Sequence, residues 1–465
     1  MSDCNVRAYS AEARCRPLHS RLRTSVATAC TLLAVAACAG ASGAGAVSTA
    51  PLPALSARDF ARSVDAMLTA PRFRNANWGV LIVDPIRGDT LYSRNAGKLF
   101  MPASNQKLLT GATALAQLGP DYRFTTRFAS TGSLRDGVID GDLVVLGTGD
   151  PTFSDSLWSG DHRNAFRAMA DSLATRGVHA ISGSLIRGGA PFTDGACGYG
   201  WEADDLNEPF AACVEELFVN EGLVRVRRDG DSEATSSAEV AIRNPRGAFF
   251  AALRDAFVER GIVVAGGTDS TRVARDSALV PLFTMASPPL ATILARMLKP
   301  SQNQIAELLF KTIGRERGGA GRADSARRVV ERQLVAWGAD SAGFAVRDGS
   351  GVSRHDYLTP ETIMRVLDAM RRHPSYADWR AALPIAGVDG TLATRMRGTA
   401  AEGNVRAKTG TVDKARSLSG YVTTADGKTL MFSFLCNNFT VPNREVELVQ
   451  DAILVTLASR PVPRR

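Results

Sequence analysis

Histidine, lysine and cysteine are scarce in this chain of 465 residues, which contains five, seven and seven of them respectively. No Cys-x-x-Cys pair or close Cys/His spacing occurs, so we expect no metal site and no cofactor. The histidines lie far apart in the sequence, which disfavours a His-dependent catalytic triad. Gly-x-Ser-x-Gly, Walker and His-Glu-x-x-His motifs are also missing, which argues against an α/β-hydrolase, a P-loop enzyme and a zinc metalloprotease.

The sequence also lacks a concentrated stripe of basic residues. The net charge of +8 arises from 55 basic and 47 acidic residues that are scattered along the chain, which does not predict nucleic-acid binding. Apolar residues make up 45% of the chain and charged residues 22%, which is the balance of a folded globular protein of one to three domains. Nothing in the sequence indicates an oligomeric state.

The N-terminal segment has the layout of an export signal. Residues 1–23 are rich in arginine, residues 24–37 are apolar and uncharged, and small residues follow. The apolar stretch is too short to span a hydrocarbon core of ~30 Å. We therefore assign residues 1–37 to the signal and 38–56 to a linker, and expect an exported protein of the periplasm or cell envelope.

Two outcomes of signal cleavage remain open. Val35-Ala36-Ala37-Cys38 resembles a bacterial lipobox, which would make Cys38 the lipidated first residue and tether the protein to a membrane. Ala44-Gly45-Ala46 instead offers an ordinary cleavage site between small residues.

Three cysteines lie beyond these segments. Cys197 and Cys213 are close enough in sequence to form a disulfide in an oxidising compartment, and two independently buried thiols are the alternative. Cys436 lies in an apolar run that is typical of a strand and is predicted to belong to the core.

Hydrophobic periodicity predicts a mixed α/β (α+β) fold, in which helices cover a sheet. Between residues 124 and 284 the pattern changes to short apolar runs separated by Gly/Asp turns, with one clear helix, and we interpret this stretch as a mostly β inserted region. The predicted helices are 58–69, 104–118, 165–176, 289–298, 302–314, 324–337, 360–372 and 443–458, and the predicted strands are 78–83, 90–93, 138–146, 180–186, 223–227, 239–242, 418–424 and 429–435.

A serine and a lysine three residues apart form the first candidate site. Ser104 and Lys107 lie at the start of a predicted helix, so their side chains should share one face. The helix start favours negative charge that develops on Ser104. Lys107 can accept the serine proton only when neutral, which requires its pKa to fall by about 3 units through burial and a nearby cation.

Two further motifs complete the set. In Lys408-Thr409-Gly410-Thr411, Lys408 supplies the second cation, and Gly410 allows the substrate to approach the strand closely. Thr409 offers a hydroxyl to an anionic group of the substrate. The N–H of Thr411 could pair with that of Ser104 to form an oxyanion hole. Ser301-Gln302-Asn303 supplies a hydroxyl for proton relay and an amide for the peptide group of the substrate. In this order on an exported chain, the three motifs describe a penicilloyl-serine transferase site.

Over residues 60–455 the chain resembles the D-alanyl-D-alanine carboxypeptidase/endopeptidase family of low-molecular-mass class C penicillin-binding proteins. Besides the site motifs, the resemblance rests on Phe100-Met101-Pro102-Ala103-Ser104, Gly149-Asp150-Pro151-Thr152, Gly200-Trp201 with Asp204-Asp205, Asp348-Gly349-Ser350-Gly351-Val352-Ser353-Arg354, Asp389-Gly390-Thr391-Leu392 and Ser419-Gly420-Tyr421-Val422. It implies a penicillin-binding, serine β-lactamase-like catalytic domain over 57–123 and 285–460, with accessory structure inserted at 124–284.

The resemblance also implies the reaction. Ser104 would attack the carbonyl of the penultimate D-Ala of a peptidoglycan stem peptide or crosslink, water would release the acyl-enzyme, and β-lactams would act as inhibitors. Lys408 and Thr409 would hold the substrate carboxylate, and Arg354 would line the site.

The sequence departs from the family at two places. An Asp of the inserted region is thought to meet the free amine of the substrate's diamino acid, but Gly188 occupies the aligned position, with Asp194 nearby as a substitute. Asp413-Lys414-Ala415-Arg416 is more charged than expected, and we interpret it as a solvated turn.

Two alternative functions remain. A serine β-lactamase would share the chemistry but needs fast deacylation, and the sequence offers no identifiable glutamate of the class A type. A non-catalytic cell-wall-binding protein with a relict site is the second alternative, and the intact set of polar residues argues against it.

Overall fold

The computed structural model describes residues 52–227, 237–274 and 279–462. The expected export signal, both cleavage alternatives at Cys38 and Ala44-Gly45-Ala46, and most of the expected linker lie outside the described residues. In the part of the chain that is described, no helix has both the length and the apolar character needed to cross a membrane.

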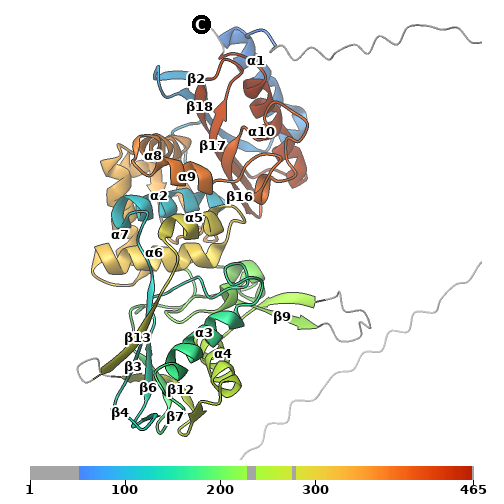
Figure 1. The fold of residues 1–465 in the computed structure, drawn as a ribbon. Helices are drawn as coiled ribbons and strands as arrows, with labels where there is room; N and C mark the ends of the chain where they lie inside the picture. The colour runs from blue at the N-terminus through green and yellow to red at the C-terminus, as the bar shows by residue number, and fades with distance from the viewer. Residues whose placement is uncertain (1–51, 228–236, 275–278, 463–465) are drawn as a thin grey trace, which may run out of the picture. The chain divides into compact units, whose positions relative to one another are not determined.

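A five-stranded antiparallel sheet joins the two ends of the described chain (Figure 1). Its strand order is β16-β17-β18-β1-β2, so the first two strands in the sequence lie beside the last three. β16 is an edge strand, so one side of its backbone faces away from the other strands. The strands are β1 (Asn77–Asp84), β2 (Asp89–Arg94), β16 (Arg406–Val412), β17 (Ala415–Thr423) and β18 (Thr429–Asn437).

Alternating side chains bury both faces of this sheet against helices. Phe432 and Phe434 of β18 pack with α1 and α10, whereas Met431 and Leu435 of the same strand pack with the helices on the opposite face. Cys436 is buried in the first of these cores, as predicted. One face carries α1 (Ala57–Leu68) and α10 (Asn443–Ala458), and the other carries α2 (Gln106–Leu118), α5 (Leu290–Leu298), α6 (Asn303–Gly318), α7 (Ala323–Ala336), α8 (Pro360–Arg372) and α9 (Tyr376–Ala382).

The segment between β3 and β13 has a hydrophobic core of its own. Phe166 of α3 and Phe249 of α4 stack edge to face within this core, 5.0 Å apart between ring centroids. Its two main sheets have the orders β12-β8-β6-β3-β13 and β11-β7-β5-β4. The elements are β3 (Thr125–Ser130), β4 (Leu134–Arg135), β5 (Val138–Ile139), β6 (Leu143–Leu146), α3 (Arg163–Ala174), β7 (Ala180–Ile181), β8 (Leu185–Gly188), β9 (Leu223–Arg227), β10 (Ser237–Ala241), α4 (Pro245–Glu259), β11 (Val263–Val264), β12 (Thr268–Ala274) and β13 (Val280–Ala286), and a separate short pair is β14 (Phe344–Ala345) with β15 (Tyr357–Leu358).

Sequence periodicity was misleading at several places in this segment. Each of the predicted strands 138–146 and 180–186 is in fact two short strands separated by a turn. In the first of them, the turn contains Gly141, which has a φ of 128°. α4 was not predicted, although Asn244 caps Gly247 N and Pro245 occupies the first turn, which are recognisable start signals. Outside this segment, the short helix α9 was also not predicted.

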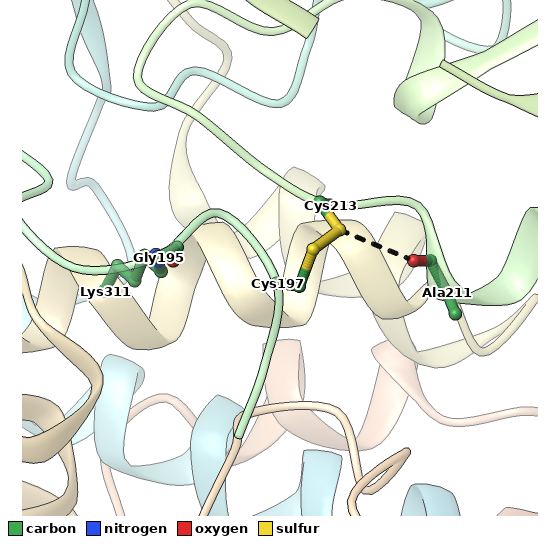
Figure 2. The surroundings of a disulfide bond; sticks show 5 residues. All are labelled: Gly195, Cys197, Ala211, Cys213 and Lys311. Carbon is green, nitrogen blue, oxygen red and sulfur yellow. Dashed lines mark hydrogen bonds between the residues drawn. A yellow bond between two sulfur atoms is a disulfide. The ribbon is translucent and has the colours of Figure 1, made fainter. Parts of the chain in front are cut away.

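A disulfide between Cys197 and Cys213 closes a loop that rests on α6 (Figure 2). The structure thus decides between the two alternatives for these cysteines. Lys311 of α6 holds the loop through a hydrogen bond from Nζ to Gly195 O at 2.6 Å and an ion pair with Asp194 at 2.8 Å. This attachment brings residues of the loop to the helices that carry the candidate catalytic motifs.

We expect the double replacement Cys197→Ser/Cys213→Ser to lower the free energy of unfolding by about 3 kcal/mol, because the 16-residue separation defines the loop whose closure restricts the unfolded chain. Denaturant unfolding monitored by circular dichroism measures the difference. A reducing agent should shift the midpoint of the unaltered protein toward that of the double variant and leave the variant unchanged. An unaltered protein that is insensitive to reductant would contradict the prediction.

Candidate active site

The three sequence motifs meet at a cavity of about 500 Å³ beside the edge strand β16. Ser104, Ser301, Asn303, Thr409, Gly410, Thr411 and Arg354 all line it, and Lys107 and Lys408 contact residues that line it. The other lining residues are Asp205, Phe210, Gly351, Val352, Thr391, Val412, Asp413, Arg416 and Asn443.

Ser104 lies in a turn of 3-10 helix, Ala103–Asn105, that leads directly into α2. Lys107, one turn further on, places its Nζ 2.8 Å from Ser104 Oγ, as the spacing predicted. Ala103, just before the serine, has a φ of 48°, a conformation that a residue with a Cβ adopts only at a cost of order 1 kcal/mol. Such backbone strain concentrates at functional sites because it orients reactive groups.

The Lys107 amine is completely buried and has two further partners. Its Nζ donates to Asn303 Oδ1 and to the carbonyl oxygen of Ser350, the latter at 2.8 Å. Burial lowers the pKa of Lys107 from 10.5 to about 7, against the opposing influence of the nearby Asp348 and Glu307 carboxylates. The neutral amine is therefore accessible at physiological pH.

The geometry around Nζ determines where the lone pair of a neutral Lys107 points. Asn303 Oδ1 and Ser350 O are both pure acceptors, so they take the two hydrogens of the neutral amine. The remaining position faces Ser104 Oγ, whose hydroxyl can donate to it. Lys107 is thus arranged to accept a proton from Ser104.

The Ser350 carbonyl is held in place by two buried acidic side chains. Glu307 accepts hydrogen bonds from the Gly349 and Ser350 N–H groups at 3.0 and 2.8 Å. Asp348 accepts from the N–H groups of Ser350 and Gly351 at 3.1 and 2.6 Å. A Cβ on Gly351 would lie 1.9 Å from Ala103 O, so the loop packs this closely against the serine turn only with glycine there.

Lys408 of β16 links the second and third motifs. Its Nζ donates to Ser301 Oγ at 2.7 Å and to Thr409 O at 2.9 Å. Burial, and next the positive charge of Lys107, lower the pKa of Lys408 well below its usual value. Ser301 has a φ of 67°, a second left-handed conformation beside the cavity.

Asn303 is engaged at both ends of its amide. Oδ1 accepts from Lys107, and Nδ2 donates to the carbonyl oxygen of Phe210 in the disulfide-closed loop at 2.6 Å. The amide nitrogen carries a second hydrogen, which can still serve the peptide group of a substrate. Asn303 therefore orients Lys107 as well as facing the cavity, a role that the sequence did not indicate.

The edge strand approaches the serine turn closely at Gly410. A Cβ there would lie 2.0 Å from Ser417 Oγ and 3.0 Å from Ser104 N. Thr409 Oγ1 donates to Thr391 Oγ1 at 2.7 Å, and Thr411 is exposed on the cavity wall. The backbone of β16 thus forms one wall of a narrow cleft whose other wall carries Ser104.

Arg354 lies at the cleft between the edge strand and the inserted segment. It donates to Asp413 O at 3.3 Å and forms ion pairs with Glu202 at 3.4 Å and Asp205 at 3.8 Å. Asp205, which the sequence placed only in a family motif, supplies a carboxylate to the cavity wall.

The charged segment after the Lys408 motif is not wholly a solvated turn. Asp413 and Lys414 are exposed, as predicted, but Ala415 and Arg416 begin β17 and are buried. Arg416 is only 7% exposed and nevertheless lines the catalytic cavity.

Neither of the two positions considered for amine recognition lines the cavity. A Cβ at Gly188 would lie 2.5 Å from Leu146 Cγ, so this buried strand position has no room for an acidic side chain. Asp194, the expected substitute, is bound by Lys311 and by Ala323 N and does not line the cavity.

One cluster of potential metal ligands occurs among the described residues, away from the cavity lining. Asp155, Asp161 and His162 place ligand atoms within 4.8 Å of one another. Arg163 and Arg167 already pair with Asp161, and His162 bonds to Asp155, so these groups have protein partners.

Sequence reasoning missed the contributions of Ser350, Phe210 and Thr391. Ser350 and Phe210 act through their backbone carbonyl oxygens, which every type of residue has, so the sequence does not reveal their contribution. In the sequence, the motif Asp348-Gly349-Ser350-Gly351 was the one feature that pointed to this loop. Its contact with Lys107, through the Ser350 carbonyl, depends on the tertiary fold.

A family model and several relatives match this chain. The model of the D-Ala-D-Ala carboxypeptidase 3 (S13) family matches residues 60–234 and 229–460. The D-alanyl-D-alanine carboxypeptidase of Actinomadura sp. strain R39 is 33% identical over 466 residues, covering 86% of this chain and 84% of that protein. The D-alanyl-D-alanine carboxypeptidase DacB of Haemophilus influenzae is 24% identical, covering 81% of this chain and 89% of that protein.

Solved structures confirm the predicted fold class. Penicillin-binding protein 4 of Haemophilus influenzae superposes with a TM-score of 0.72 at 23% identity, covering 83% of this chain and 97% of that chain. The same protein in complex with a β-lactam gives a TM-score of 0.66 at 23% identity, covering the same shares of each chain. The predatory endopeptidase Bd0816 of Bdellovibrio bacteriovorus gives a TM-score of 0.53 at 20% identity, covering 84% of this chain and 96% of that chain.

Proposed function

Because the chain belongs to the D-Ala-D-Ala carboxypeptidase 3 (S13) family and is a serine-type D-Ala-D-Ala carboxypeptidase, we propose that Ser104 is the nucleophile of this hydrolase. The observation that carries the proposal is the contact between Ser104 Oγ and the buried Lys107 amine at 2.8 Å. This arrangement supplies an activated hydroxyl without a histidine.

Acylation follows from the positions of these groups. The neutral Lys107 amine takes the Ser104 proton while Oγ bonds to the carbonyl carbon of the penultimate D-Ala. The N–H groups of Ser104 and Thr411 bind the resulting oxyanion. When the C–N bond breaks, the leaving amine takes a proton relayed through Ser301 and Lys408, which are in contact at 2.7 Å. Water then attacks the ester, which releases the acid and regenerates Ser104.

The substrate carboxylate is assigned to Lys408 and Thr409. Two buried amines close together disfavour simultaneous protonation. Burial, and next the positive charge of Lys107, lower the pKa of Lys408 well below its usual value, whereas burial alone lowers that of Lys107. A bound carboxylate favours the charged form of Lys408, and that charge in turn keeps Lys107 neutral. Substrate binding and activation of the serine would thereby be coupled. Arg354 and Asn303 would contact the acyl part of the substrate.

We assign the catalytic domain to residues 57–123 and 285–460 and an accessory domain to residues 124–284. Peptidoglycan stem peptides are the expected substrates, and β-lactams the expected acylating inhibitors, since a β-lactam complex exists for the structurally similar protein of Haemophilus influenzae. We further propose DD-endopeptidase activity on crosslinks. The location is the cell envelope, reached through the signal of residues 1–37.

The activity is tested on isolated muropeptides. We expect mass spectrometry to detect loss of one D-Ala from pentapeptide stems and cleavage of the D-Ala to diamino-acid bond of crosslinked dimers. Loss of D-Ala without crosslink cleavage would contradict the endopeptidase proposal, and absence of both would contradict the proposed function. A chromogenic cephalosporin serves as a control: a peptidase gives a burst equal to the enzyme concentration, whereas repeated rapid turnover would identify a β-lactamase.

A further inference from the structure

Both acceptors of the Lys107 amine are held by one loop of the inserted segment. This disulfide-closed loop, residues 197–213, rests on α6 (Figure 2). Lys107 Nζ donates to Asn303 Oδ1 and to Ser350 O, and neither of these acceptors belongs to the loop. The loop reaches the first of them directly and the second through a single carboxylate. What this attachment means for the reaction rests on the proposed function, in which Lys107 is the base that activates Ser104.

Phe210 of the loop holds the first acceptor. Its carbonyl oxygen accepts a hydrogen bond from Asn303 Nδ2 at 2.6 Å, and the carbonyl oxygen of Pro209 accepts one from Gln304 Nε2 at 2.9 Å. A side-chain amide is planar, so a contact that fixes Nδ2 also fixes Oδ1, the atom that faces Lys107. The loop thereby sets the direction from which Asn303 approaches the amine.

Trp201 of the loop holds the second acceptor through Asp348. Its indole Nε1 donates to Asp348 Oδ2 at 2.9 Å, and Asp348 Oδ1 accepts from the N–H groups of Ser350 and Gly351 at 3.1 and 2.6 Å. The bond from Trp201 therefore limits rotation of the carboxylate, and the carboxylate fixes the turn whose carbonyl faces the amine. Ser353 N also donates to Oδ2, at 2.7 Å, so removing the indole N–H should loosen this turn rather than release it.

The backbone before Trp201 packs closely against the segment that contains Asp348. Gly200 has a φ of 73°, and a Cβ there would lie 2.4 Å from His355 Cδ2, so this approach requires glycine. The rings of Tyr199 and His355 lie 5.7 Å apart between centroids. Trp201 is half-buried and does not line the cavity, so its contact with Asp348 supports the site from outside the substrate cleft.

The ends of the loop have a second link besides the disulfide. Val214 N donates to Ala196 O at 2.9 Å, and Val214 is buried in a small cluster with Phe192, Phe218 and Leu308. Without the disulfide, we therefore expect the loop to become more mobile but to stay in place on α6.

We propose that the disulfide-closed loop orients the general base, and that Trp201 is its positioning residue. The loop supplies no reacting atom. It keeps Asn303 Oδ1 and Ser350 O where they take both hydrogens of the neutral Lys107 amine, so that the lone pair stays directed at Ser104 Oγ. Loosening either acceptor lets the amine rotate, which lowers the fraction of time in which it can accept the serine proton. Through this loop, the inserted segment contributes to acylation.

Trp201→Phe tests the proposal, because it removes the indole N–H and retains an aromatic ring. The rate constant of acylation by penicillin should fall about tenfold, since a small misplacement of a catalytic group can cost up to about 10²-fold. Stopped-flow traces over a range of penicillin concentrations separate this rate constant from the affinity for unreacted penicillin, which should change less than about twofold. Every folded molecule should still become labelled, whereas a merely structural defect would lower the labelled fraction.

Trp158→Phe is the matched control for this variant. Trp158 is a half-buried tryptophan of the inserted segment that packs against the segment's own core and does not line the cavity. This variant should acylate at the rate of the unaltered protein. Folded Cys197→Ser/Cys213→Ser should become fully labelled but acylate about threefold more slowly, because the loop keeps only one of its two links.

Three outcomes decide the matter. An unchanged rate constant in folded Trp201→Phe, or a slower reaction explained wholly by weaker affinity or by fewer labelled molecules, would overturn the positioning role alone. If Trp201→Phe does not fold, the double cysteine variant decides by the same criterion. Failure of the unaltered protein to be acylated at all would overturn the proposed function and the positioning role with it.

Discussion

Replacing Ser104 by alanine should abolish covalent labelling by a fluorescent penicillin and lower kcat/KM for D-Ala-D-Ala peptides by at least ~10⁴-fold. The reason is chemical: under the proposed mechanism no ester can form without Oγ, and Lys107 loses the hydroxyl that lies 2.8 Å from its Nζ. Gel fluorescence after denaturation measures the covalent adduct, and D-Ala release measures the turnover.

Ser93→Ala is the matched control for this experiment. Ser93 begins a second Ser-x-Asn sequence, but it is exposed on β2 and does not line the catalytic cavity. We expect this variant to label and turn over as the unaltered protein does. Persistent labelling of folded Ser104→Ala would exclude Ser104 as the nucleophile.

Replacing Lys107 by methionine should reduce the rate of acylation by about 10³-fold, within the range expected for loss of a general base. Methionine has a similar length and suits a buried position, but it cannot accept the Ser104 proton. Stopped-flow measurement of penicillin acylation gives the rate constant directly. Lys428→Met, in the exposed turn between β17 and β18, is the control and should acylate normally. Acylation of Lys107→Met within tenfold of normal would contradict the assigned role.

The pH dependence of acylation provides an independent test of Lys107. Burial lowers its pKa to about 7, so the amine is neutral above that pH and an ammonium below it. Because only the neutral form accepts a proton, the acylation rate should fall about tenfold for each pH unit below 7 and level off above 7. A profile that is flat between pH 5 and 9 would exclude a lysine base with this pKa.

Several elements could be predicted from the sequence because their information is local. The helices α2, α8 and α10 follow from apolar residues at helical spacing, and the β17–β18 hairpin from alternating apolar residues around Asp426-Gly427. Where the sequence predicted continuous strands at 138–146 and 180–186, turns interrupt the apolar runs. Periodicity over so few residues does not distinguish one strand from two.

The identities of the candidate site residues were also available from the sequence. Ser104 and Lys107 are one helical turn apart, so their contact needs only the helix. Lys408, Ser301 and Asn303 could be named from their motifs, but their mutual contacts depend on how β16 and α6 pack.

The primary structure alone determined the family, the fold class and the set of candidate site residues, since these depend on short motifs and on repeating apolar patterns. Tertiary packing decided what those residues can do. The pKa of Lys107 is about 7 because its side chain is completely buried, and the carbonyl of Ser350 orients its amine. Neither the burial nor this contact can be read from the residues that neighbour Lys107 in the sequence. Packing likewise turned Arg416 from an expected surface charge into a buried one, because solvent exclusion is a property of the assembled fold.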